Sequence, residues 1–168
     1  MTERVFGITG WKNSGKTTLT VRLTAALAER GLKVATVKHA HHSFEVDQPG
    51  TDSFRHREAG ATETAIVSGR RWALMHELRG EDEPSLTDIL DRLSPSDVVL
   101  VEGYKREPHP KIECRRLDAL DRTPLAGAVP GVVAVASDSP EEGVSLPLFA
   151  LDDIEGIADF IVRHLGII

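Results

Sequence analysis

Short apolar runs alternate with longer amphipathic segments along the chain, and this order predicts a mostly parallel β-sheet covered by helices. The run at 97–102 (DVVLVE) is the strongest signal for a central strand. Helices are expected where apolar residues recur every three or four positions. The expected strands are 5–9, 33–38, 97–102, 112–117 and 132–136, and the expected helices are 17–30, 85–93 and 153–165.

The stretch between residues 39 and 79 departs from this pattern. It is polar, contains Pro49-Gly50, and predicts only a short helix at 52–59. Strands are expected at 64–67 and 72–78, the second with Trp72 and Leu74 on the same side. Such a hairpin is typical of an antiparallel edge or of an arm for dimer contacts.

A glycine-rich loop follows the first expected strand. Residues 10–17 (GWKNSGKT) match G-x-x-x-x-G-K-[ST] between a strand and a helix. Gly10 and Gly15 let successive N–H groups turn toward a phosphate, to which the helix N-terminus also contributes. Lys16 supplies charge to the β and γ phosphates, and the Thr17 hydroxyl is suited to Mg²⁺. The residues expected to bind nucleotide in this loop are Gly10, Trp11, Lys12, Asn13, Ser14, Gly15, Lys16, Thr17 and Thr18.

These patterns together predict an α/β fold, a P-loop NTPase-like three-layer domain with a mostly parallel sheet and an antiparallel hairpin insertion. We expect residues 1–168 to form a single P-loop nucleotide-binding domain, with the strand-rich insertion around 62–79.

A carboxylate is expected beside the Mg²⁺ ion. Glu102 ends the strand 97–102 and is the candidate for the Walker B position, although it could act through a water molecule, serve as a base, or only cap the following turn. Asp47 is the second candidate for the metal or the γ-phosphate. Asp52 could serve the site or act as the N-cap of the short helix. Metal ligation by His39 and its neighbouring histidines is disfavoured, because adjacent residues on a strand face opposite ways.

Composition narrows the functional classes. The net charge of −6 argues against binding to nucleic acid or to an anionic membrane. Cys114 is the single cysteine, so an internal disulfide is impossible, and we expect an inert, half-buried thiol. The sequence shows neither a membrane-length apolar stretch nor a signal-peptide pattern, which favours a cytoplasmic location.

Three segments carry a resemblance to a known family. ITGWKNSGKTTL, VKHAHHSFEVDQPGTDSFRHREAGA and DVVLVEGYK resemble the MobB family of molybdenum cofactor biosynthesis. The resemblance extends from Arg4 to at least Asp138. It implies a GTP-binding adaptor that assists the guanylyltransferase MobA in forming molybdopterin guanine dinucleotide. A homodimer, a preference for GTP, contact with the molybdopterin cofactor and weak or absent intrinsic hydrolysis are implied by the same resemblance.

The residues leave alternatives open for base recognition and for turnover. The guanine-reading pattern N-K-x-D does not occur, and Asp138, after the strand 132–136, is either the base-reading carboxylate or a turn residue. At most a weak GTPase is expected without a partner. The alternative is a P-loop small-molecule kinase using ATP, with the arginine-containing segment 105–116 as its lid. The hairpin at 64–78 is the candidate dimer arm.

Overall fold

The structure is a computed structural model that describes residues 4–167. Its contacts group the chain into two compact units. One unit contains the residues up to His39 and from Leu93 onward, and the other contains residues 40–92. The expectation of a single domain remains a prediction.

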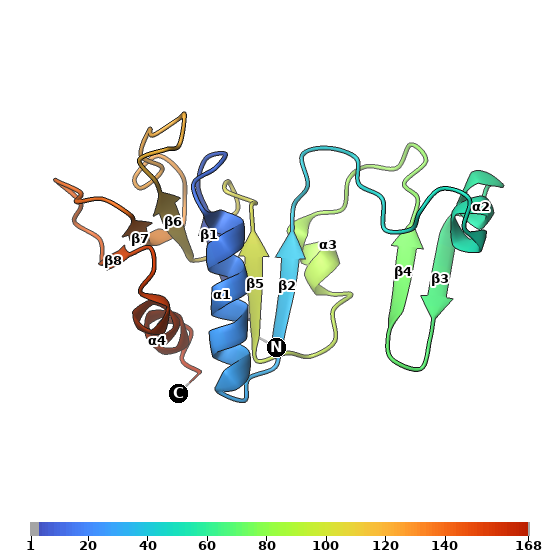
Figure 1. The fold of residues 1–168 in the computed structure, drawn as a ribbon, viewed down its shortest axis with the longest axis horizontal. Helices are drawn as coiled ribbons and strands as arrows, with labels where there is room; N and C mark the ends of the chain where they lie inside the picture. Colours follow the sequence, from blue (N-terminus) through green and yellow to red (C-terminus); the bar gives the residue numbers. More distant parts are fainter. Residues whose placement is uncertain (1–3, 168) are drawn as a thin grey trace. The chain divides into compact units, whose positions relative to one another are not determined.

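The larger unit is built on a six-stranded sheet (Figure 1). The strand order is β2-β5-β1-β6-β7-β8, and every neighbouring pair runs parallel. The carboxyl ends of these strands therefore meet at one edge, where ligands bind in open α/β sheets. The strands are β1 (Val5–Thr9), β2 (Val34–Lys38), β5 (Val98–Glu102), β6 (Lys111–Arg115), β7 (Val132–Ser137) and β8 (Leu148–Ala150). The expected α/β fold with a mostly parallel sheet is confirmed.

Two helices, α1 (Lys16–Glu29) and α4 (Ile154–His164), pack on the same apolar side of this sheet. Phe6 and Ile8 of β1 point into this core because they are two residues apart on a strand. Each is fully buried. This packing fixes the start of α1 beside the carboxyl end of β1, which is the position that the glycine-rich loop requires.

The connection from β5 to β6 crosses β1 without a helix. The ring of His109 lies so close to Gly7 that a β-carbon there would come within 2.6 Å of the His109 Nε2 atom. The Gly7 amide donates to the Pro110 carbonyl at 2.8 Å. Lys111 is fully buried, and its ammonium donates to the carbonyls of Glu107 and Pro130. Glycine is thus required in β1 so that this connection can lie against the strand.

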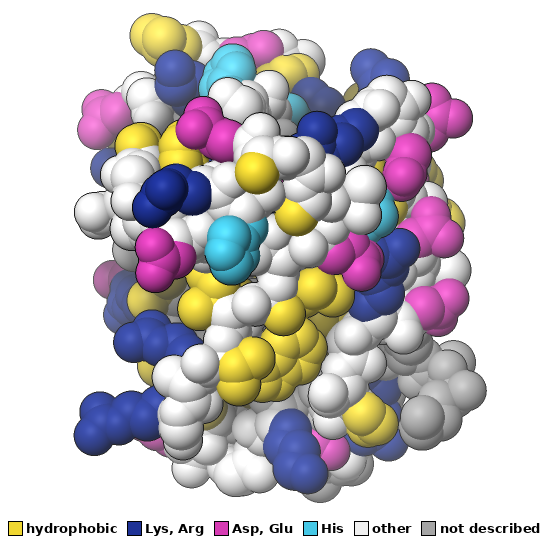
Figure 2. Space-filling model, turned by 90° about the vertical axis from the view of Figure 1, so that its right-hand side faces the viewer, with side chains coloured by type: hydrophobic (Ala, Val, Ile, Leu, Met, Phe, Trp, Pro, Cys, Tyr) yellow, Lys and Arg dark blue, Asp and Glu magenta, His cyan; other side chains and the backbone are white. Residues whose placement is uncertain are grey.

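The smaller unit contains the expected hairpin. Its elements are α2 (Asp52–Glu58), β3 (Glu63–Val67), β4 (Trp72–His76) and α3 (Leu86–Leu90). β3 and β4 are antiparallel, and Val67 is paired with Trp72. On that face Val67 is 75% exposed, Trp72 70% and Leu74 51%. Hydrophobic side chains are also gathered in one area of the face drawn in Figure 2. A hairpin with an apolar exposed face is suited to a protein contact.

Three local expectations differ from the structure. β8 was not anticipated, because a strand of three residues gives too short a pattern to distinguish from a loop. Asp52 is not the N-cap of α2, since Thr51 occupies that position. The thiol of Cys114 is fully rather than half buried, and burial raises its pKa to about 12, which agrees with an inert thiol.

His109 predicts a specific dependence of stability on pH. Burial lowers the pKa of His109 from 6.5 to about 4, so between these pH values the unfolded chain is protonated at this residue and the folded chain is not. The contribution of neutral His109 to stability is therefore fully present above pH 6.5 and is lost as the pH decreases toward 4. Between pH 7.5 and 5.0 the free energy of unfolding should fall by roughly 1–2 kcal/mol more in the wild type than in His109→Gln. Urea titrations at both pH values measure this difference, and equal losses in the two proteins would contradict it.

Candidate nucleotide-binding site

The glycine-rich loop joins β1 to α1, as expected from the sequence. Gly10 has φ of 150° and Gly15 has φ of 92°. A β-carbon on Gly10 would lie 2.3 Å from the Ser14 Oγ atom and 2.8 Å from the Cys114 carbonyl oxygen. Side chains are therefore excluded at Gly10 both by conformation and by space. Gly15 directly precedes α1, so the free N–H groups of the first helical turn lie beside the loop.

Lys16 folds back over this loop. Its Nζ atom donates to the carbonyl oxygens of Gly10, at 2.9 Å, and Trp11, at 2.7 Å. Burial lowers the pKa of Lys16; the Glu102 carboxylate opposes this shift, and the ammonium groups of Lys105 and Lys38 add to it. The ammonium of Lys16 therefore lies at the loop, where a phosphate would be held.

Thr17 and Glu102, which are 85 residues apart in the sequence, are brought together. The Thr17 hydroxyl donates to the Glu102 Oε1 atom at 2.7 Å, and the Lys38 Nζ atom lies 3.6 Å from the same oxygen. Glu102 is only 8% exposed. A hydroxyl and a carboxylate are oxygen ligands of the kind that Mg²⁺ prefers. Among residues 4–167, no group of three or more His, Cys, Asp or Glu side chains is placed to hold a metal. Mg²⁺ would thus depend on water and phosphate oxygens for most of its ligands.

A cavity of about 760 Å³ lies beside the start of α1, at the carboxyl ends of β7 and β8. Thr18 and Asp138 are among the residues that line it. The Asp138 Oδ1 atom accepts from the Leu117 amide at 3.0 Å, and its Oδ2 atom lies 3.6 Å from the Arg116 Nε atom. Asp138 is therefore at the cavity wall and is held by its neighbours in a defined orientation.

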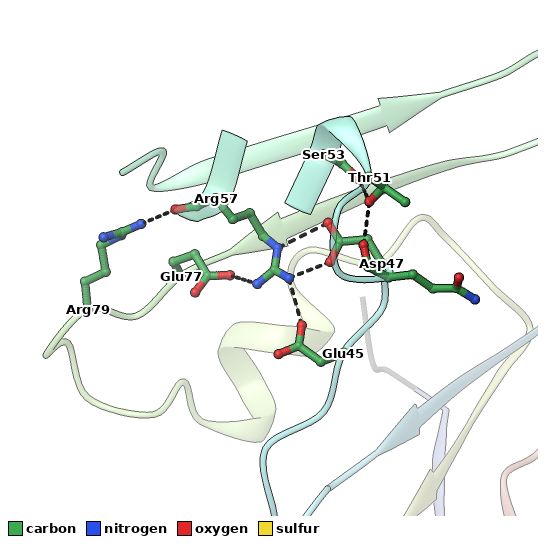
Figure 3. Close-up of polar contacts among 8 residues, drawn as sticks. Glu45, Asp47, Thr51, Ser53, Arg57, Glu77 and Arg79 are labelled. Carbon is green, nitrogen blue, oxygen red and sulfur yellow. Dashed lines mark hydrogen bonds and ion pairs between the residues drawn. The ribbon is translucent and has the colours of Figure 1, made fainter. Parts of the chain in front are cut away.

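Asp47 is paired with an arginine in the smaller unit (Figure 3). Both of its carboxylate oxygens accept from the Arg57 guanidinium, which also contacts Glu45 at 2.7 Å and Glu77 at 2.9 Å. The Arg57 hydrogen bonds hold the pKa of Asp47 below its usual value. Ligation of a metal by Asp47 remains a prediction, and Arg57 is the partner that the metal would have to displace.

Two groups at the loop were not assigned to it from the sequence. The strand that ends at Lys38 is expected to bring its carboxyl end beside the loop, but the sequence assigns no role there to the Lys38 side chain. Lys105 belongs to the segment 105–116, which the sequence offers only as the lid of the alternative kinase. Its Nζ atom lies 4.1 Å from the centroid of the Trp11 ring, in a contact between residues 94 positions apart that no local pattern could predict.

The chain is similar to known proteins of one family. Residues 5–138 match the family model MobB, described as molybdopterin guanine dinucleotide synthesis protein B. The chain is 41% identical over 157 residues to a molybdopterin-guanine dinucleotide biosynthesis adapter protein of Escherichia coli (strain K12), covering 92% of this chain and 89% of that protein. The corresponding adapter protein of Haemophilus influenzae is 40% identical over 165 residues, which cover 96% of this chain and 89% of that one.

A solved structure shares the fold over nearly its whole length. The crystal structure of Bacillus subtilis MobB superimposes with a TM-score of 0.74 at 27% identity, covering 95% of this chain and 96% of that one. The family model matches most of the chain, and both relatives exceed 30% identity over nine-tenths of it. The chain therefore belongs to the MobB family.

Proposed function

We propose that the chain is an adaptor in molybdopterin guanine dinucleotide biosynthesis that binds GTP with Mg²⁺ and assists a MobA-like guanylyltransferase. The observation that carries this proposal is the glycine-rich loop, with Lys16 over it and the Thr17–Glu102 pair beside it. The relatives in Escherichia coli and Haemophilus influenzae are named adapter proteins of this pathway. None of the reported comparisons favours the ATP-dependent small-molecule kinase that the sequence left open.

In this proposal the ammonium of Lys16 changes its hydrogen-bond partners when a phosphate binds. Lys16 leaves the carbonyls of Gly10 and Trp11 and contacts phosphate oxygens, which bind an ammonium more strongly than neutral carbonyls do. The N–H groups at the start of α1 donate to the same phosphates. Thr17 and Glu102 bind Mg²⁺ directly or through water, and Asp47 stays a further candidate if it is released from Arg57.

The guanine base is assigned to the cavity of about 760 Å³ beside Thr18. A carboxylate recognises guanine by accepting hydrogen bonds from two neighbouring N–H groups at its edge. Asp138 is the candidate, because the Leu117 amide orients its carboxylate at the wall of this cavity. Adenine lacks that pair of donors, so Asp138 would favour GTP over ATP.

The location and assembly of the protein are part of the same proposal. The adaptor acts in the cytoplasm as a homodimer, with the molybdopterin cofactor presented to the partner enzyme. It acts apart from membranes and nucleic acids. Each helix among residues 4–167 is too short or too polar to cross a membrane.

Titration calorimetry with GTP and ATP, with and without Mg²⁺, tests nucleotide binding. The wild type should bind GTP selectively and with Mg²⁺ dependence. Lys16→Ala should weaken GTP binding by at least about tenfold, because a charge-assisted contact to phosphate is lost. Asp138→Asn should reduce the preference for GTP over ATP. Equal or tighter binding of ATP by the wild type would instead favour the kinase.

Glu102→Gln tests the contribution of Mg²⁺ to GTP affinity separately from that of the phosphate contacts. This variant keeps the shape of the side chain and a hydrogen-bond acceptor for Thr17 but removes the charge that attracts Mg²⁺. The gain in GTP affinity on adding Mg²⁺ should fall by about tenfold, while affinity in EDTA should not decrease. Glu29→Gln, at the far end of α1, is the matched control. An unchanged Mg²⁺ effect in Glu102→Gln would remove Glu102 from the metal site.

The apolar face of the hairpin provides a test of the dimer. Trp72→Ser combined with Leu74→Ser, or deletion of residues 64–78, should yield soluble monomers, because the exposed apolar area would no longer be covered by a second copy. Ile66→Ser alters the opposite face and should leave the dimer intact. Light scattering after gel filtration gives the mass of each variant, and a dimer that survives the deletion would refute this role of the hairpin.

A further inference from the structure

The chain turns sharply where it leaves β5. Gly103 has φ of 98° and Tyr104 has φ of 49°, so two consecutive residues adopt the left-handed conformation. This conformation is unfavourable for tyrosine, and such strain is concentrated at functional sites in proteins. The Tyr104 ring lies 4.7 Å from the ring of His39, which follows the neighbouring strand β2. The turn directly precedes Lys105 and begins one residue after Glu102.

Lys105 is fixed against the glycine-rich loop by an aromatic contact. Its Nζ atom lies 4.1 Å from the centroid of the Trp11 ring, a distance that allows a cation–π interaction. The indole is itself anchored, because its Nε1 atom donates to the Thr123 carbonyl at 2.8 Å. Trp11 is the first residue after Gly10, so this contact holds the ammonium of Lys105 against the glycine-rich loop.

The charged groups near the loop carry an excess of positive charge, which favours binding of an anion. Lys105 and Lys38 both act electrostatically on Lys16, and the pKa of Lys16 is lowered by burial and by these two neighbours. Glu102 is the carboxylate that opposes them, and it is shared between Thr17 and Lys38. Lys16, Lys38 and Lys105 thus bring three ammonium groups to the region of the loop against the single carboxylate of Glu102, and an excess of positive charge attracts a polyphosphate.

We propose that Lys105 is a further phosphate-binding residue, supplied from outside the glycine-rich loop and positioned by the Trp11 indole to contact the polyphosphate of the bound nucleotide. The inference rests on the proposed binding of GTP and adds a residue to that site. The contact with Trp11 keeps the long lysine side chain from sampling other directions, which reduces the entropy lost when a phosphate binds.

The test uses residues 1–168 with the substitution Trp72→Phe, which leaves Trp11 as the single tryptophan of this sequence. GTP is titrated against Lys105→Met, Lys105→Arg and the neighbouring control Arg106→Met, with calorimetry and Trp11 fluorescence as readouts. Lys105→Met should weaken GTP binding by about tenfold, Lys105→Arg should retain most of the affinity, and Arg106→Met should bind as the parent does. Increasing KCl should weaken GTP binding less in Lys105→Met than in the parent, because one screened charge is missing.

The possible results separate this inference from the proposed function. If the parent binds GTP and Lys105→Met binds equally well, Lys105 has no phosphate contact and the inference is wrong, whereas GTP binding stands. If Lys105→Arg is as weak as Lys105→Met, or if the salt dependence is the same in all variants, the charge is not what matters and the inference is again overturned. If the parent fails to bind GTP and is indistinguishable from its Lys16→Ala variant, the proposed function fails, and the role of Lys105 fails with it.

Discussion

The position of β5 between β1 and β2 is the constraint on which the proposed phosphate site depends. The register pairs Glu102 with Ile8 on one side and with Lys38 on the other. A buried carboxylate, a lysine and the start of the glycine-rich loop therefore lie at the same edge of the sheet. The hydrogen bond from Thr17 to Glu102 then ties the first turn of α1 to this edge. A shift of the register by one residue would turn Glu102 to the other face of the sheet and leave Thr17 without this carboxylate.

A layer of buried polar groups supports the loops around the site. Alternation in β6 predicts a half-exposed strand, yet Lys111 and Glu113 are almost completely buried because connecting loops cover them. Burial of a charged group is tolerated only when it is fully partnered. Glu113 accepts from the amides of Leu125 and Ala126, at 2.8 and 2.9 Å, and also from Arg115. The segment that these bonds anchor carries the carbonyl that orients the Trp11 indole.

Sequence predicted the parts of the site that depend on local pattern. The glycine-rich loop, the strand ending at Glu102 and the hairpin each follow from spacing within a few residues, and the structure contains all three. The contact of Lys105 with Trp11 depends on the tertiary path of the chain, so spacing did not reveal it. The partner of Asp47 was missed for another reason. Arg57 is only ten residues away, but sequence alone does not show which of several nearby cations a carboxylate will contact.

If the chain binds a nucleotide as we propose, groups that are already in place would hold it. Lys16 binds two carbonyls of its own loop and is attracted by Glu102, while Lys38 and Lys105 repel it, so some electrostatic repulsion acts on its ammonium. A polyphosphate relieves this repulsion, since each ammonium gains an opposite charge and the pKa of Lys16 rises again. In the proposed site, the favourable charge interactions would come from three lysines on different segments, namely Lys16 at the start of α1, Lys38 at the end of β2 and Lys105 after β5. Such a site would favour nucleotides with more phosphates through charge alone, whereas we propose that the choice of base depends on the separate cavity near Asp138.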